Sequence, residues 1–181
     1  MPKLIALLRA INVGGHNVKM DDLRKLFEEL GLSSVETFIA SGNVIFDAPA
    51  QDVRALERRI EGHLRSALGY EVATFIRSAA ELAEIASYEP FPATELAAEG
   101  ASLYIAFLPG PPGEEAQAKL MALRTDVDDF HFHGRELYWL CRIRLSESKF
   151  SGALLEKTLK MPATMRNSTT VKKLAAKYPA S

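Results

Sequence analysis

Three short polar stretches hold the residue types that could bind a ligand. The first begins at Arg9 and contains a glycine pair, the second is centred on Gly42, and the third spans residues 164–170. Arginine binds a carboxylate or phosphate through two parallel hydrogen bonds, and asparagine and serine can orient the bound group. We therefore predict a cleft between the two halves of the chain that binds a small anionic ligand, a nucleotide or a phosphate-bearing metabolite. The predicted ligand-binding residues are Arg9, Asn12, Gly14, Gly15, Ser41, Asn43, Lys149, Arg166, Asn167 and Thr170.

The glycine pair of the first stretch has two interpretations. It lies between a predicted strand and a predicted helix, where phosphate-binding loops occur, but neither GxxxxGK[ST] nor GxGxxG is present. Asp21 and Asp22 stand at the start of that helix and would repel a phosphate. The alternative is an ordinary loop in which Gly14 and Gly15 adopt positive φ and Asn12 bonds the local backbone.

The second and third stretches also have a structural interpretation beside the functional one. Ser41-Gly42 predicts the two-residue turn of a β-hairpin, with Ser41 and Asn43 facing the same rim as Arg9. In the third stretch, Asn167 or Ser168 caps a helix whose first turn contains hydroxyls and no acids. With Arg166 beside it, this helix end is a candidate anion site, and the alternative is an ordinary capped helix with a solvated arginine.

Another group of polar residues, separate from the three stretches, lies on a second predicted hairpin that turns at Gly134-Arg135. Across this turn His133 opposes Glu136 and His131 opposes Tyr138, all on one face. Two histidines and a carboxylate could hold a metal or transfer a proton. We favour a half-exposed polar face and predict no metal site. The opposite face is predicted to be the core face, and it consists of Phe130, Phe132, Leu137, Trp139 and Cys141.

Hydrophobic periodicity predicts the elements that position these stretches. The first half has strands at about 3–11, 35–40, 43–46 and 71–77, and helices at about 21–30 and 52–68. Their order is β-α-β-β-α-β, as in ferredoxin-like units. The second half repeats it with strands at about 101–108, 129–133 and 136–142 and helices at about 114–123 and 150–159, but a helix at 168–177 takes the place of the closing strand.

The predicted fold class is therefore α+β, with two ferredoxin-like βαββα(β) halves, antiparallel sheets and a C-terminal helix. The predicted domains are residues 1–80, a connecting helix and loop at 81–100, and residues 101–181.

The first predicted hairpin carries apolar residues on both faces. A two-residue turn would pair Ile39 with Val44 and Phe38 with Ile45, and successive pairs point to opposite faces. The helices of a ferredoxin-like half cover only one face of its sheet. The other face must therefore be covered by the second half, by a ligand or by a partner chain, so a homodimer is left open.

Composition excludes several classes of protein. The chain has 181 residues with a formal charge of −1, which gives no general attraction to nucleic acid or to an anionic membrane. There is no apolar span long enough to cross a membrane and no signal peptide. Cys141 is the only cysteine, so a reducing cytoplasm is the expected compartment.

At the three polar stretches the chain resembles a bacterial family labelled domain of unknown function 1697. The matching residues are Leu8-Arg9-Ala10-Ile11-Asn12-Val13-Gly14-Gly15, Ser41 through Phe46, and Pro162-Ala163-Thr164 with Arg166-Asn167 and Thr170 through Leu174. The resemblance covers essentially the whole chain and implies an α+β fold of two ferredoxin-like halves. It implies no particular activity, because the family has no established one, and the cofactor is left unknown. Ser168 stands where family members often have a tryptophan, so a ligand that stacks on that aromatic would bind differently here.

Three functions remain as hypotheses. Binding of a small anionic ligand ranks first, and whether such a protein is also an enzyme does not follow from the residues. A protein-interaction or regulatory module that uses the apolar sheet face ranks second. RNA binding ranks last, because the first strand lacks an aromatic residue and the chain is not basic.

Overall fold

The computed structural model describes residues 1–9, 11, 17–39 and 42–180. The chain divides into two compact units, one formed by Met1–Ala83 with Leu174–Ser181 and the other by Glu84–Lys173. This division gives the C-terminal residues to the first unit, whereas the sequence suggested that they belong with the second half. The boundaries fall inside two helices, α3 (Ala79–Ser87) and α7 (Ser168–Lys177).

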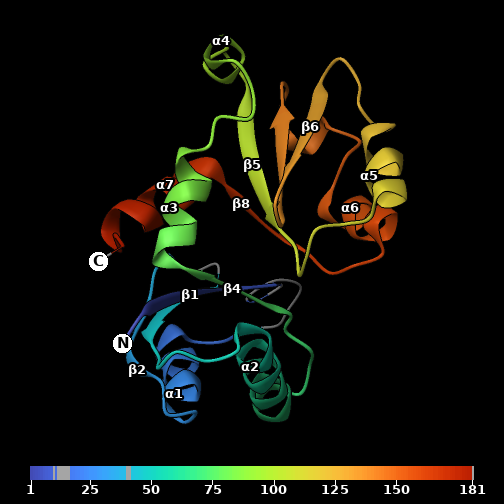
Figure 1. Cartoon of the computed structure of the whole chain (residues 1–181). Helices are drawn as coiled ribbons and strands as arrows, with labels where there is room; N and C mark the ends of the chain where they lie inside the picture. Colours follow the sequence, from blue (N-terminus) through green and yellow to red (C-terminus); the bar gives the residue numbers. More distant parts are fainter. Residues whose placement is uncertain (10, 12–16, 40–41, 181) are drawn as a thin grey trace. The chain divides into compact units, whose positions relative to one another are not determined.

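The first unit contains one four-stranded antiparallel sheet in the order β2-β3-β1-β4. Two helices, α1 and α2, lie on the same face of this sheet (Figure 1). In chain order the elements are β1 (Lys3–Leu8), α1 (Met20–Glu28), β2 (Ser33–Thr37), β3 (Asn43–Asp47), α2 (Val53–Leu68) and β4 (Thr74–Ser78), followed by α3.

Alternation along the strands explains how both faces of the first sheet become buried. On β1, Leu4, Ala6 and Leu8 pack with the apolar residues of α1 and α2, while Ile5 and Leu7 point to the opposite face. These last two side chains are also fully buried, so the predicted need for a cover on the second face is confirmed. The C-terminus contributes near the first hairpin, where the rings of Phe38 and Tyr178 meet edge to face at a centroid distance of 6.3 Å.

The predicted register of the first hairpin is wrong. Glu36 lies opposite Ile45 and Thr37 opposite Val44, and the Phe38 N–H donates to the carbonyl of Asn43. The loop is thus two residues longer than a two-residue turn. Ile39 and Phe38 lie beyond the end of β2, but Val44 and Phe46 still point to one face of β3 and Ile45 to the other, and all three are buried.

From the sequence, Asp21 is expected to be the N-cap of α1, but the helix already begins at Met20. Its N-cap position is Lys19, which makes no side-chain cap, and Asp21 and Asp22 lie in the first turn instead. Acidic residues in the first turn interact favourably with the positive end of the helix dipole. They therefore stabilise the helix without serving as its cap.

The second unit contains another four-stranded antiparallel sheet, in the order β6-β7-β5-β8. The sequence predicted no closing strand here, and β8 corrects that prediction. This strand has only four residues and runs directly into α7 without a loop, so its alternation is too short to be recognised. In chain order the elements are α4 (Ala93–Leu96), β5 (Ser102–Phe107), α5 (Glu114–Met121), β6 (Asp128–His133), β7 (Glu136–Cys141), the 3₁₀ turn η1 (Leu145–Glu147), α6 (Gly152–Leu159) and β8 (Thr164–Asn167), followed by α7.

The second hairpin has the predicted register, with His133 opposite Glu136 and His131 opposite Tyr138. Its predicted core face is confirmed as well. The side chains on that face pack with those of α5 and α6 in one apolar cluster that includes Phe130, Leu137, Trp139, Cys141, Leu120, Leu155 and Leu159. No helix in the described part of the chain has the length and apolar character needed to cross a bilayer.

Candidate functional site

The predicted ligand-binding residues fall in both units. Arg9 and Asn43 belong to the first unit, and Lys149, Arg166, Asn167 and Thr170 belong to the second. The remaining four, Asn12, Gly14, Gly15 and Ser41, lie outside the described residues. A cleft that brings the two groups to one ligand stays a prediction, so each group is described within its own unit.

In the first unit, Asn43 holds the first hairpin turn together. Its side chain is fully buried and its Nδ2 donates to the carbonyl of Phe38 over 2.9 Å. Gly42 has a φ of +82°, and a Cβ built on it would lie 3.1 Å from the Cβ of Leu8, so this position requires glycine. This stretch therefore lies in the connection of a hairpin, as predicted, but the connection is not the predicted two-residue turn. Arg9 is partly exposed just beyond β1, and its N–H donates to the carbonyl of Ala73.

In the second unit, Arg166 places a positive charge inside the protein. Its side chain lies on β8, the residue is 8% exposed, and its Nη1 donates to Thr164 Oγ1 over 2.7 Å and to the carbonyl of Met165 over 2.9 Å. Burial lowers the pKa of Arg166 to about 10, so the guanidinium is still charged at neutral pH. The expectation of a solvated arginine beside α7 is wrong.

The start of α7 has the predicted cap. Asn167 Oδ1 accepts a hydrogen bond from the N–H of Thr169 over 2.9 Å, and the first helical turn contains no acidic residue. Thr169 is exposed, and Thr170 is partly buried. Lys149 is exposed in the segment that leads to the Ser151 cap of α6. The helix end next to Arg166 therefore carries hydroxyls, an amide and positive charge.

The histidine-bearing face of the second hairpin is covered by the segment that follows α3. Tyr88 Oη lies 2.7 Å from His131 Nε2, and the Tyr88 ring stacks on His133 with centroids 3.9 Å apart. Tyr138 and Glu136 are buried, so the expectation of a half-exposed polar face is wrong for these two. Among the described residues, no three histidine, cysteine, aspartate or glutamate side chains converge to hold a metal.

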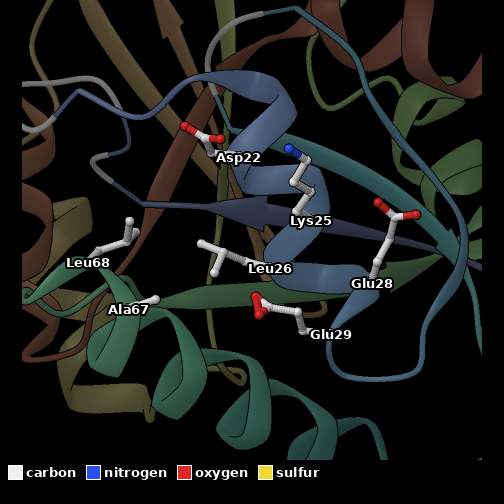
Figure 2. Close-up of a pocket in the computed structure, with 7 residues that line it drawn as sticks. All are labelled: Asp22, Lys25, Leu26, Glu28, Glu29, Ala67 and Leu68. Carbon is white, nitrogen blue, oxygen red and sulfur yellow. The ribbon is translucent and has the colours of Figure 1, made fainter.

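A surface pocket of about 740 Å³ lies between α1 and α2 in the first unit (Figure 2). Leu26 and Leu68 form apolar lining, and the charged side chains around them are three carboxylates and one ammonium group. None of the predicted ligand-binding residues lines this pocket, and its acidic rim disfavours an anion. The full lining is Asp22, Lys25, Leu26, Glu28, Glu29, Ala67 and Leu68.

Sequence reasoning missed a second buried arginine, Arg77 on β4. Its Nη1 donates to the carbonyl of the preceding residue, Ile76, over 3.0 Å, as Arg166 does to Met165. In each case a helix follows directly, capped by the Ser78 side chain in one unit and by that of Asn167 in the other. The tripeptides Ile-Arg-Ser and Met-Arg-Asn were the only sequence signal for this correspondence.

A buried carboxylate, Asp128 on β6, was also missed. It accepts hydrogen bonds from Trp139 Nε1 over 2.8 Å and from Ser148 Oγ over 2.8 Å. Ser148 Oγ in turn accepts from the N–H of Phe150. These bonds join the hairpin to the segment before α6 and give Asp128 a structural role.

Two antiparallel sheets with the same strand order, each joined in the order β-α-β-β-α-β, define an α+β protein made of two equivalent units. The chain belongs to the family described as protein of unknown function (DUF1697), whose family model matches residues 1–138. That match ends before the third polar stretch.

A solved structure extends the similarity to nearly the whole chain. The conserved bacterial protein SP0830 from Streptococcus pneumoniae is 24% identical, with a TM-score of 0.76 over 98% of each chain. At this identity the likeness shows the fold alone. No curated protein matches the chain.

Proposed function

We propose that this protein binds a small anionic ligand, a nucleotide or a phosphate-bearing metabolite, at the N-terminal end of α7. The observation that carries the proposal is the charge pattern of this helix end. Its first turn has hydroxyls and no acids, and the guanidinium of Arg166 stands one residue before the Asn167 cap. Helix N-termini attract anions through the dipole and the free N–H groups of the first turn.

The buried guanidinium and the exposed helix end have different roles in this proposal. Arg166 is bonded to Thr164 and Met165, so it supplies a fixed positive field. The hydroxyls of Thr169 and Thr170, with the first-turn N–H groups other than that of Thr169, which Asn167 caps, supply the direct contacts to the ligand. Arg9 and the exposed Lys149 are predicted to add charge to the same ligand. No reaction is assigned.

The test replaces the helix cap. Asn167→Asp keeps an equally good cap but places a negative charge where the anion would bind, while Asn167→Ser keeps a neutral cap. Thermal shift with a panel of inorganic phosphate, nucleotides and sugar phosphates measures binding, because a ligand that binds only the folded state raises the melting temperature.

A panel member should raise the melting temperature of the wild type and of Asn167→Ser, and it should leave Asn167→Asp unchanged. An equal shift in both variants would place the anion elsewhere. Arg9→Ala and Lys149→Ala, both at exposed or partly exposed positions, report whether these residues contribute.

The alternative of a protein-interaction module with an apolar sheet face has less support. Among the described residues, the large apolar side chains that are exposed are Met1, Ile39 and Leu145, and none of them belongs to β1, β3 or β5.

We also propose that each unit is ferredoxin-like, and that the protein works in a reducing cytoplasm. The strand order and the β-α-β-β-α-β sequence of elements support the first point. The buried thiol of Cys141 supports the second.

A further inference from the structure

The outer edge of β4 is occupied by side chains of neighbouring elements. This strand is an edge of the first sheet and pairs with β1 on its inner side. The backbone groups of Thr74, Ile76 and Ser78 point away from β1, since their N–H groups donate to side chains. Backbone groups on an uncovered sheet edge are a template for the addition of another strand, but here Thr74 and Ile76 are buried.

Three carboxylates accept these three outward N–H groups. Glu61 Oε2 accepts from Thr74 over 2.9 Å, and Glu57 Oε2 accepts from Ile76 over 2.8 Å. Glu81 Oε1 accepts from Ser78 over 3.0 Å as part of the capping box that starts α3.

The outward carbonyl of Ile76 is also taken, because it accepts from Arg77 Nη1. At Ile76, in the middle of the edge, both the N–H and the carbonyl are therefore hydrogen-bonded to side chains.

The spacing of two of the carboxylates matches the strand. Glu57 and Glu61 are four residues apart on α2, which corresponds to about 6 Å along a helix. Thr74 and Ile76 are two residues apart, which corresponds to about 6.6 Å along a strand. One turn of α2 therefore places a carboxylate opposite every second residue of β4, at the spacing of its outward N–H groups.

These carboxylates are held at an energetic disadvantage. Glu57 is only 6% exposed, and burial raises the pKa of Glu61 above its ordinary value. Burying a carboxylate costs free energy unless hydrogen bonds compensate it. Glu57 and Glu61 each accept a hydrogen bond from a backbone N–H of β4. These bonds offset the free-energy cost of burying the two carboxylates.

We propose that Glu57, Glu61 and Glu81 close the β4 edge against strand addition, and that without Glu57 and Glu61 this edge pairs with β4 of a second copy of the chain. A second copy is the fitting occupant because two antiparallel β4 strands related by a two-fold axis at Ile76 offer each other the same donors and acceptors. The edge then becomes the centre of an eight-stranded sheet.

The test compares the full chain with Glu57→Ala/Glu61→Ala and with Glu57→Gln/Glu61→Gln. The alanine variant removes the acceptors, whereas glutamine keeps an acceptor oxygen at each position. Light scattering after gel filtration, over a hundredfold range of concentration, should show an additional species of doubled mass for the alanine variant. The glutamine variant should match the wild type.

Amide hydrogen exchange locates the contact. The N–H groups of Thr74 and Ile76 should exchange faster in the dilute alanine variant and become protected again at high concentration. A folded alanine variant with the mass of the wild type at every concentration would overturn the proposal.

If circular dichroism shows that the double variant is unfolded, Glu57→Leu/Glu61→Leu takes its place, since leucine fills the space of each side chain and carries no acceptor for the N–H groups of Ile76 and Thr74. That variant should show the same concentration dependence at Thr74. A mass equal to that of the wild type at the highest concentration would again overturn the proposal.

Discussion

Arg77 and Arg166 occupy the same position in two different sheets. Arg77 on β4 lies opposite Ile5 of β1, and Arg166 on β8 lies opposite Ile105 of β5. Each is buried, and each donates to the carbonyl of the residue before it. The arginine that the sequence singled out for ligand binding is therefore also a repeated structural feature of the fold.

This correspondence predicts the effect of removing each guanidinium. Arg77→Met and Arg166→Met keep an apolar stem but lose the charge-assisted bond to the strand, so each should lower the free energy of unfolding by about 1.5–3 kcal/mol. Urea denaturation followed by circular dichroism measures both. A large loss for Arg77→Met with none for Arg166→Met would mean that Arg166 is kept for binding and not for folding.

The hydrogen bonds that Asp128 accepts from Trp139 and Ser148 should contribute to stability. Trp139 is the single tryptophan, so its fluorescence can follow unfolding. Asp128→Ala leaves the buried Trp139 indole N–H and the Ser148 hydroxyl without their acceptor, at a cost of about 1–3 kcal/mol. Urea denaturation should detect this cost both by Trp139 fluorescence and by circular dichroism. In a Trp139→Phe background the N–H is already absent, so by circular dichroism Asp128→Ala should cost less there. An equal cost in both backgrounds would show that the indole bond contributes nothing.

Because of Tyr138, we expect the protein to lose stability at alkaline pH. The Tyr138 hydroxyl donates to the carbonyl of Ile85, and burial raises the pKa of Tyr138 far above its ordinary value of 10.0. Below pH 10 the hydroxyl is protonated in both states, and above it the unfolded chain releases the proton first, so stability falls as pH rises.

The measurement is the urea midpoint of wild type and Tyr138→Phe at pH 8 and at pH 10.5. The variant should cost about 0.5–1.5 kcal/mol at pH 8 for the lost bond, but it should lose less stability between the two pH values. Tyr104→Phe, on the opposite face of the sheet, serves as the matched control. A variant that falls as steeply as the wild type would contradict this prediction.

We predict that replacing Ile39 by glycine stabilises the protein. Ile39 has a φ of +58° and is 49% exposed, an unfavourable backbone conformation for a β-branched residue that gains little from burial. Left-handed backbone costs an ordinary residue about 1–2 kcal/mol, and the extra chain entropy of glycine offsets about half of the relief. Ile39→Gly should therefore raise the free energy of unfolding by roughly 0.5–1 kcal/mol. A loss of stability instead would mean that the Ile39 side chain makes contacts that outweigh its backbone strain.

The parts of the fold that could be predicted depend on neighbours in the sequence. The register of the second hairpin followed from the Gly134-Arg135 turn, and the cap of α7 followed from Asn167. The register of the first hairpin was missed because its loop is set by contacts with another strand. The Leu8 N–H donates to the carbonyl of Gly42, and the side chains of Leu8 and Ile11 leave no room for a Cβ at position 42.

The alternation of apolar residues was enough to determine two α+β halves with apolar residues on both faces of the first sheet, because side-chain direction depends only on position within a strand. What each buried charge does was decided by the tertiary structure alone. Glu57 bonds a backbone N–H that lies 19 positions away in the sequence, and Asp128 bonds an indole 11 positions away. Arg166 could be recognised as a charge near a helix start, but its burial depends on elements distant in the chain. Local pattern specifies which groups need a partner, and only packing specifies which partner they find.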